Sequence, residues 1–246
     1  MLKVLDLFSG VGGFSLGLER TGGFKTVAFC EIEPYCRSVL AKHWPGIPCY
    51  GDIRTLTANQ LRSDGIAVDV ICGGFPCQDI SSAGKRAGIN GSRSQLWSEF
   101  ARLIGELRPS FVIVENVAAL LRRGMDRVLA DLAHLGYDAE WECLQASDFG
   151  APHRRKRIII VAYPQRDQKS WAEPRHWPFR RMGGFIQSIP WDSDWQSALT
   201  FFRGMDDGIP HIVDRTDAMR NSIIPQIPEL IGHAILNARK PSQETI

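Results

Sequence analysis

Short apolar runs alternate with helical patterns along most of the chain, and this alternation constrains the fold more than any other sequence feature. Predicted strands cover residues 3–7, 26–30, 68–72, 111–115, 141–144 and 158–163. Predicted helices cover residues 12–20, 34–42, 94–108, 124–135 and about 227–238. Strands that alternate with helices are typical of an α/β fold in which helices cover a mostly parallel sheet.

Proline and glycine mark several of these helix boundaries. Pro34 stands at the first position of its predicted helix, where the missing N–H costs nothing. The helix over 94–108 is expected to stop before Pro109, and Gly136 is expected to end the helix over 124–135.

Residues 164–210 break the pattern. This stretch contains four of the seven tryptophans, together with several prolines and glycines. It is interpreted as a small irregular insertion, which divides the chain into residues 1–163, 164–210 and a segment 211–246 that returns to the first unit.

Charge is unevenly distributed although the formal net charge is only +2. Residues 151–181 contain nine Lys or Arg and two acids, whereas residues 182–214 contain one Arg and five Asp. A basic stripe of this kind suits contact with a polyanion, and a solvated charged face is the alternative.

The six cysteines show no C-x-x-C spacing, which argues against a structural zinc site. No secretory signal opens the chain, and no apolar run reaches the ~20 residues that span a bilayer. The cysteines are therefore interpreted as reduced thiols of a cytoplasmic protein, with no metal and no membrane partner.

Residues 6–13 place several glycines where a strand turns into a helix, which is typical of nucleotide binding. Glu31 ends the second predicted strand, where its carboxylate can accept hydrogen bonds from ribose hydroxyls. Asp52 follows a third short segment and can reach an adenine amino group. A nicotinamide dehydrogenase stays open on these features, although Ser15 stands where its fingerprint needs glycine.

Cys77 follows the strand over 68–72 in a turn that also contains Pro76. A thiol at the carboxyl end of a parallel strand faces the side where open α/β sheets bind ligands. A buried structural thiol is the alternative, and it fits Cys72 better than Cys77. The loop that follows is rich in cations and glycines, which favours an accessible thiolate.

Five motif blocks in order resemble the cytosine-C5 DNA methyltransferase family across nearly the whole chain. They are Phe8-Ser9-Gly10-Val11-Gly12-Gly13, Pro76-Cys77-Gln78, Glu115-Asn116-Val117, Arg155-x-Arg157 and Asn221-Ser222. The resemblance implies a Rossmann-like methyltransferase fold in which residues 164–210 are a short target-recognition insertion. It also implies S-adenosylmethionine as cofactor and double-stranded DNA as substrate.

The resemblance further implies a covalent mechanism on a flipped-out base. Cys77 would add to C6 of cytosine, and Glu115 with a raised pKa would protonate or hydrogen-bond N3. Arg157 would hold O2, and Arg155 would support the pocket and the thiolate. The alternatives are a helix N-cap for Glu115 and a basic strand end for the two arginines.

The implied binding residues form two sets. Cofactor contacts are expected from Phe8, Ser9, Gly10, Gly12, Gly13, Glu31, Ile32, Asp52, Ile53, Phe75, Leu96, Asn221 and Ser222. DNA contacts are expected from Ser81, Ser82, Lys85, Arg93, Arg180 and Arg181. For the apolar members of the first set, plain core packing is the alternative.

The sequence departs from the family pattern at three points. His153 replaces the usual Gln, Arg220 replaces the usual Gly before Asn221, and the recognition segment is short. The short segment suggests a short recognition site or the need for a partner subunit, and a cognate restriction endonuclease is another expected partner. A tRNA cytosine methyltransferase and a DNA-binding homologue with impaired turnover are the rival functions.

Overall fold

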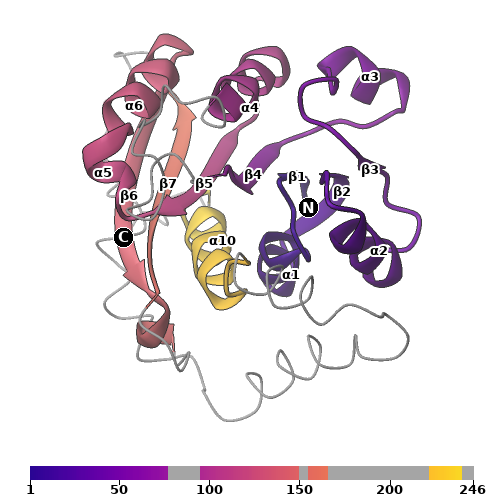
Figure 1. Ribbon diagram of the computed structural model, residues 1–246, viewed down its shortest axis with the longest axis horizontal. Helices are drawn as coiled ribbons and strands as arrows, with labels where there is room; N and C mark the ends of the chain where they lie inside the picture. The colour runs from indigo at the N-terminus through magenta and orange to yellow at the C-terminus, as the bar shows by residue number, and fades with distance from the viewer. Residues whose placement is uncertain (77–94, 150–154, 166–221, 240–246) are drawn as a thin grey trace, which may run out of the picture.

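The computed structural model describes residues 1–76, 95–149, 155–165 and 222–239, and their strands form one twisted sheet (Figure 1). Seven strands of the described residues pair in the order β3-β2-β1-β4-β5-β7-β6. Their bounds are β1 Leu2–Leu7, β2 Phe24–Cys30, β3 Cys49–Tyr50, β4 Val70–Gly74, β5 Phe111–Val117, β6 Tyr137–Gln145 and β7 Lys156–Pro164. The first five strands in this order run parallel, and β7 is antiparallel to both β5 and β6.

Helices cover both faces of the sheet. Their bounds are α1 Gly13–Arg20, α2 Pro34–His43, α3 Ala58–Ser63, α4 Gln95–Leu107, α5 Leu120–Arg123, α6 Met125–His134 and α10 Gln226–Ala238, with a 3-10 turn at Ala146–Phe149. Phe100 of α4 and Leu132 of α6 pack on one face together with Leu5 and Leu7 of β1. Leu18 of α1 and Ile231 of α10 pack on the other face, and these two helices lie side by side (Figure 1). The core is therefore two apolar layers separated by the sheet.

The predicted α/β class and mostly parallel sheet are confirmed, and each predicted strand and helix has a counterpart in the structure. The helix over 94–108 stops at Leu107, before Pro109, and Gly136 follows α6 with a φ of 80°. Four short elements were not predicted, because their few residues give apolar periodicity little to act on: β3, α3, α5 and the 3-10 turn. The predicted insertion 164–210 lies outside the described residues apart from its first two.

Parallel pairing brings several strand ends to one edge of the sheet. Leu7 of β1 pairs with Cys30 of β2 and with Gly73 of β4, and Gly74 pairs with Glu115 of β5. Because β7 runs the opposite way, its first residues lie at this same edge. Side chains from the ends of β1, β2, β4 and β5 and from the start of β7 therefore share one surface, called here the site edge.

Candidate active site

The turn after β1 has backbone conformations that favour glycine. Gly10 and Gly12 have φ values of 54° and 87°, and Phe8 also has a positive φ of 53°. A Cβ on Gly12 would lie 2.5 Å from the ring of Trp44, so this position excludes side chains for two independent reasons. The turn closes with the Gly12 N–H donating to the Ser9 carbonyl at 2.9 Å.

Asp6, near the end of β1, connects this strand with α1 on the other side of the turn. Its side chain is fully buried, and its Oδ2 accepts hydrogen bonds from the Ser15 hydroxyl at 2.8 Å and the Ser15 N–H at 3.3 Å. Burial raises the pKa of Asp6 to about 8, against the lowering effect of these hydrogen bonds. Ser15 stands where the dinucleotide fingerprint needs glycine. Its hydroxyl donates to Asp6, a hydrogen bond that glycine could not make.

Glu31 is a buried carboxylate at the end of β2 with an oriented side chain. Its Oε2 accepts the Gly10 N–H at 2.7 Å, and its Oε1 accepts the Glu33 N–H at 2.8 Å. Each oxygen retains a further lone pair for a ligand hydroxyl. The neighbouring Ile32 side chain is 58% exposed, so an apolar surface lies beside the carboxylate.

Asp52 and Ile53 follow β3 and form the next part of the site edge. Asp52 forms an ion pair with Arg54 at 2.6 Å, and hydrogen bonding to this guanidinium lowers the pKa of Asp52. The Arg54 side chain is 63% exposed, so the pair is weak and exchangeable. Ile53 is buried in the core next to it.

The C-terminal segment returns to the glycine turn. A Cβ on Gly10 would lie 3.8 Å from the Ser222 Oγ, and one on Gly13 would lie 2.5 Å from the Ile223 carbonyl oxygen. Arg155 donates to the Ser222 carbonyl at 3.2 Å, which links the start of β7 to the same segment. The structure therefore brings Ser222 next to the turn predicted to bind the cofactor.

Glu115 and Arg157 form a buried ion pair at the site edge. The Arg157 Nε lies 2.7 Å from the Glu115 Oε1, and the side chains are 19% and 11% exposed. Burial raises the pKa of Glu115, while the positive charges of Arg157 and Arg155 act in the opposite direction. The pKa of Glu115 is thus shifted upward, the direction that its predicted role as a donor to N3 requires.

Asn116 is a structural residue of this edge to which the sequence analysis gave no role. Its Nδ2 donates to the Phe75 carbonyl at 3.0 Å, and its Oδ1 accepts the Val117 N–H at 2.8 Å. Phe75 lies two residues before Cys77, so Asn116 fixes the backbone that leads to this cysteine. Its place in the Glu115-Asn116-Val117 block was the available signal.

Aromatic rings connect the cofactor side of the edge with the cysteine side. Phe8 lies 6.4 Å from Phe100, Phe100 lies 5.7 Å from Trp97, and Trp97 lies 5.4 Å from Phe75 between ring centroids. Phe75 and Trp97 are buried, and Leu96 is partly buried against the same core. Phe8, Phe75 and Leu96, three of the side chains predicted to pack near the cofactor, are thus part of one apolar layer, whereas Ile32 is exposed.

Several predicted site residues lie outside the described residues. They are Cys77, Ser81, Ser82, Lys85, Arg93, Arg180, Arg181 and Asn221, together with His153 and Arg220. Their predicted roles stay predictions. For Cys77 the structure does place the end of β4, three residues earlier, beside Glu115.

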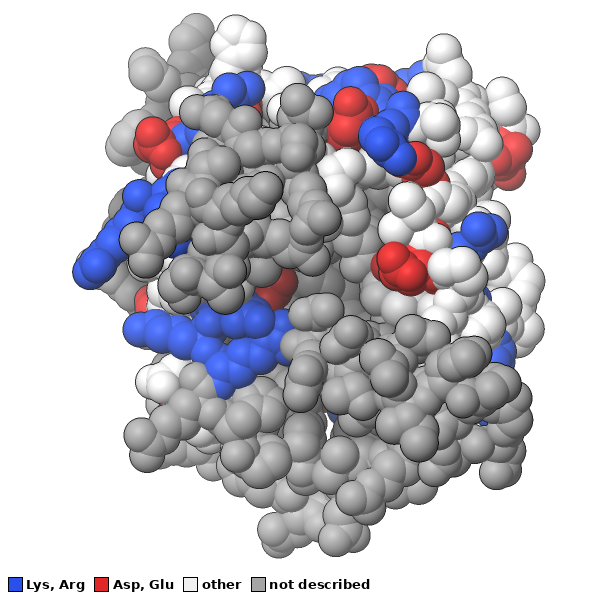
Figure 2. Space-filling model, viewed as in Figure 1, with Lys and Arg blue, Asp and Glu red and all other residues white. Residues whose placement is uncertain are grey.

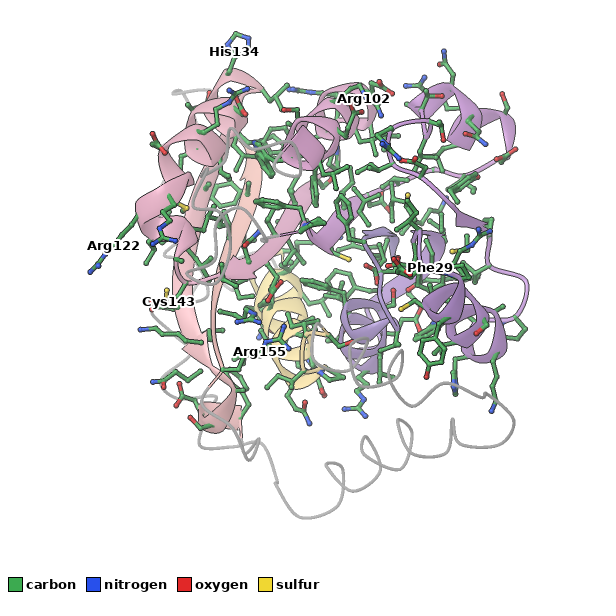
Figure 3. All side chains as sticks on the ribbon, in the orientation of Figure 1. Phe29, Arg102, Arg122, His134, Cys143 and Arg155 are labelled. Atoms are coloured by element: carbon green, nitrogen blue, oxygen red, sulfur yellow. The ribbon has the colours of Figure 1, made fainter. Side chains whose placement is uncertain are left out.

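One cluster of basic side chains lies on the face seen in Figure 2, left of centre and at about the level where Figure 3 labels Arg155. Other Lys and Arg side chains lie elsewhere on this face, several of them beside acidic ones. Among the described residues no group of His, Cys, Asp or Glu could hold a metal ion. The helices within those residues include none that is long and apolar enough to cross a membrane.

A Rossmann-like methyltransferase is the class that this fold and the arrangement of the site edge define. The family model for C-5 cytosine-specific DNA methylase matches residues 2–220, and the chain belongs to this family.

Known relatives agree with this assignment. The chain is 39% identical over 176 residues to Type II methyltransferase M2.BsuMI of Bacillus subtilis, covering 68% of this chain and 43% of the relative. It is 35% identical over 198 residues to Type II methyltransferase M1.HphI of Haemophilus parahaemolyticus, covering 77% and 53%. The chain thus spans about half the length of these relatives.

A solved structure also resembles the chain. It is a crystal structure from E. coli, described as a DNA modification methyltransferase encoded within a prophage. It matches with a TM-score of 0.57 and 32% sequence identity, and the match covers 67% of this chain and 47% of that one.

Proposed function

We propose that the chain transfers a methyl group from S-adenosylmethionine to C5 of cytosine in double-stranded DNA. The observation that carries this proposal is the buried Glu115–Arg157 ion pair of 2.7 Å beside the strand that leads to Cys77. Activation of a cytosine ring requires a carboxyl with a raised pKa, a guanidinium and a thiol; Glu115 and Arg157 provide the first two, and Cys77 is the proposed thiol.

The glycine turn and Glu31 fit the nucleoside part of S-adenosylmethionine. The positive φ values of Gly10 and Gly12 let the backbone approach a ligand closely, and both oxygens of Glu31 are oriented by backbone donors. Ile32 presents an exposed apolar surface for the adenine. Asp52 provides an acceptor for the adenine amino group when its exposed pair with Arg54 opens. When bound, the cofactor supplies an electrophilic methyl group on a sulfonium.

Cys77 starts the reaction as a thiolate that adds to C6 of the flipped-out base. Electron density moves through the ring to N3, where protonated Glu115 donates its proton, and Arg157 hydrogen-bonds O2. C5, now an enamine carbon, would receive the methyl group that the bound cofactor supplies, and S-adenosylhomocysteine would leave with the electrons of the broken C–S bond. Loss of the C5 proton to a base and expulsion of the Cys77 thiolate restore the aromatic ring, and N3 returns its proton to Glu115.

DNA binding is proposed to depend mainly on phosphate neutralisation by the basic stripe over residues 151–181. Ser81, Ser82, Lys85 and Arg93 in the loop after Cys77, and Arg180 and Arg181 in the stripe, are the proposed phosphate contacts. Few side chains then remain to read base edges, so a short recognition site is expected. A cytoplasmic role beside a restriction endonuclease is part of the proposal, and the Type II designation of the named relatives supports the endonuclease partner.

The test is methyl transfer from labelled S-adenosylmethionine to duplex DNA and, separately, to tRNA. Cys77→Ser should abolish transfer, and duplex DNA with 5-fluorocytosine should form a covalent adduct with the wild-type chain only. Cys143→Ser is the matched control, because Cys143 is a partly accessible free thiol on β6 and has no proposed role. Normal turnover by Cys77→Ser would refute the mechanism, and transfer to tRNA alone would favour the RNA alternative.

A further inference from the structure

We propose that Arg102 is a positioning residue that holds the adenine-binding segment, residues 52–58, in place. Arg102 lies on α4, far along the sequence from that segment, and none of the family motif blocks includes it. The inference rests on the proposed function, because it assumes that Asp52 and Ile53 bind the adenine.

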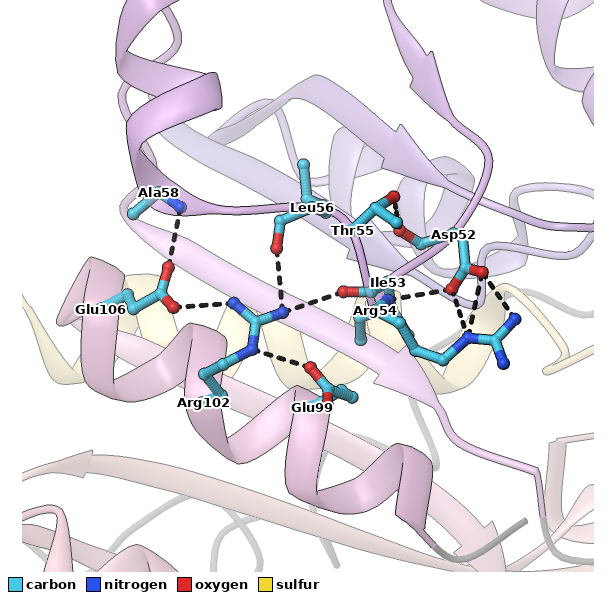
Figure 4. Close-up of polar contacts among 9 residues, drawn as sticks. All are labelled: Asp52, Ile53, Arg54, Thr55, Leu56, Ala58, Glu99, Arg102 and Glu106. Atoms are coloured by element: carbon cyan, nitrogen blue, oxygen red, sulfur yellow. Dashed lines mark hydrogen bonds and ion pairs between the residues drawn. The ribbon is translucent and has the colours of Figure 1, made fainter. Parts of the chain in front are cut away.

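One nitrogen of the Arg102 guanidinium donates hydrogen bonds to two carbonyl groups of the segment. Its Nη2 donates to the Ile53 carbonyl and to the Leu56 carbonyl, each at 2.9 Å (Figure 4). The Ile53 carbonyl directly follows Asp52 in the chain. The position of the Asp52 backbone is therefore linked to a side chain of α4.

Two carboxylates on the same helix orient this guanidinium. The Arg102 Nε contacts Glu99 at 2.7 Å, and its Nη1 contacts Glu106 at 2.7 Å. The other oxygen of Glu106 accepts the Ala58 N–H at 2.9 Å, at the start of α3 (Figure 4). The network thus binds the segment at both of its ends, and three of its contacts are to backbone atoms.

The segment itself is a short turn whose internal hydrogen bonds do not fix its place on the sheet. The Asp52 carbonyl accepts the N–H groups of Thr55 at 3.2 Å and Leu56 at 3.1 Å. Burial of the Ile53 and Leu56 side chains provides non-directional attachment. Arg102 adds directional contacts that set where the backbone after Asp52 lies, while the Asp52 carboxylate itself is held by the N–H and the guanidinium of Arg54.

Arginine suits this role for a geometric reason. Its planar fork donates in three directions at once, whereas the lysine ammonium has a different shape and cannot reach two carboxylates and two carbonyls in one plane. The first turn of the same helix contains Leu96 and Trp97, and Trp97 packs on Phe75, two residues before Cys77 in the sequence. Through α4, the adenine side and the cysteine side of the site share one rigid support.

The test combines a protein substitution with a ligand substitution. Calorimetry measures the Kd of S-adenosylhomocysteine and of its analogue with purine in place of adenine, which lacks the amino group. The wild-type chain should prefer adenine about tenfold, the scale of one hydrogen bond. Arg102→Lys should bind S-adenosylhomocysteine about tenfold more weakly and lose most of its preference over the purine analogue.

Kinetics and a control separate positioning from general loss of stability. Arg102→Lys should raise the KM for S-adenosylmethionine while kcat at saturating cofactor changes by less than about twofold. Arg127→Lys is the matched control, because Arg127 forms a comparable helical ion pair with Asp131 at 2.7 Å, on α6. It should leave both Kd values unchanged. Glu99→Gln, which loosens one side of the guanidinium, should shift the preference in the same direction by less.

The outcomes are distinguishable. If wild-type binds S-adenosylhomocysteine and the adenine preference is unchanged in Arg102→Lys and Glu99→Gln, the inference is wrong and the proposed function stands. Equal weakening of both ligands, which a merely structural role would produce, also overturns it. A wild-type chain that does not bind S-adenosylhomocysteine overturns the proposed function, and the inference with it.

Discussion

Substitution of Gly74 by alanine should displace the Glu115 carboxylate without removing any functional group. A Cβ on Gly74 would lie 2.6 Å from the Glu115 Oε2, whereas ordinary van der Waals contact begins at 3.4 Å. The carboxylate must therefore move by about 0.8 Å, the difference between these two distances. Since the other oxygen of Glu115 lies 2.7 Å from Arg157, this movement also disturbs the ion pair.

The expected effect is large on catalysis and small on stability. A displacement of about 1 Å of a catalytic group costs on the order of 100-fold in rate, so kcat of Gly74→Ala should fall about 10- to 100-fold. The atom that must move is the end of a flexible side chain, and alanine restricts the unfolded chain more than glycine does. The free energy of unfolding should therefore change by less than about 1 kcal/mol.

The assay measures kcat for DNA methylation, the Kd of S-adenosylmethionine and urea unfolding of the same preparations. Gly105→Ala is the control, because its Cβ would lie 3.1 Å from Leu135 Cδ2 between α4 and α6. It should retain wild-type kcat. Glu115→Gln provides the lower limit, since it removes the acid itself. A Gly74→Ala chain with wild-type kcat would show that the position of Glu115 is not critical, and one that fails to fold would show that the edge cannot adapt.

Three further predictions concern buried polar groups. Burial raises the pKa of Asp6 from its ordinary 3.8 to about 8, so the folded chain binds more protons than the unfolded chain between these values. The free energy of unfolding should consequently fall as pH rises from 4 to 8, and Asp6→Asn should reduce this slope in urea unfolding at a series of pH values. Asn116→Ala leaves the buried Phe75 carbonyl without its donor and should lower the free energy of unfolding by about 1–3 kcal/mol. An unchanged free energy of unfolding would show that water replaces the amide. Tyr137→Phe removes the 2.7 Å hydrogen bond to the Pro109 carbonyl and should lower stability by about 1 kcal/mol, and an unchanged urea midpoint would contradict this.

Strand and helix order could be predicted from the sequence because apolar periodicity depends on which face of each element is buried. The boundaries were less accurate where sheet pairing, and not composition, decides them. β4 continues through Gly73 and Gly74, because these residues pair with β5, although glycine has low strand propensity. β6 begins at Tyr137 and not at the predicted residue 141, because it is an edge strand that tolerates charged side chains.

The relation between Glu115 and Arg157 shows which part of the candidate site a sequence leaves undetermined. The motif blocks predicted that both residues belong to one site, but no spacing rule states whether a strand start and a strand end lie at the same edge. The answer depends on the direction of β7, which pairs antiparallel to β5 and aligns Arg157 with Val117, two residues beyond Glu115. Had β7 been parallel to β5, its first residues would lie at the opposite edge of the sheet. The raised pKa of Glu115 depends on the same arrangement, because burial at this edge disfavours the carboxylate while the adjacent arginines oppose that effect. A carboxyl with a raised pKa at this position is therefore a consequence of strand direction and burial together, and the sequence specifies it only through the fold.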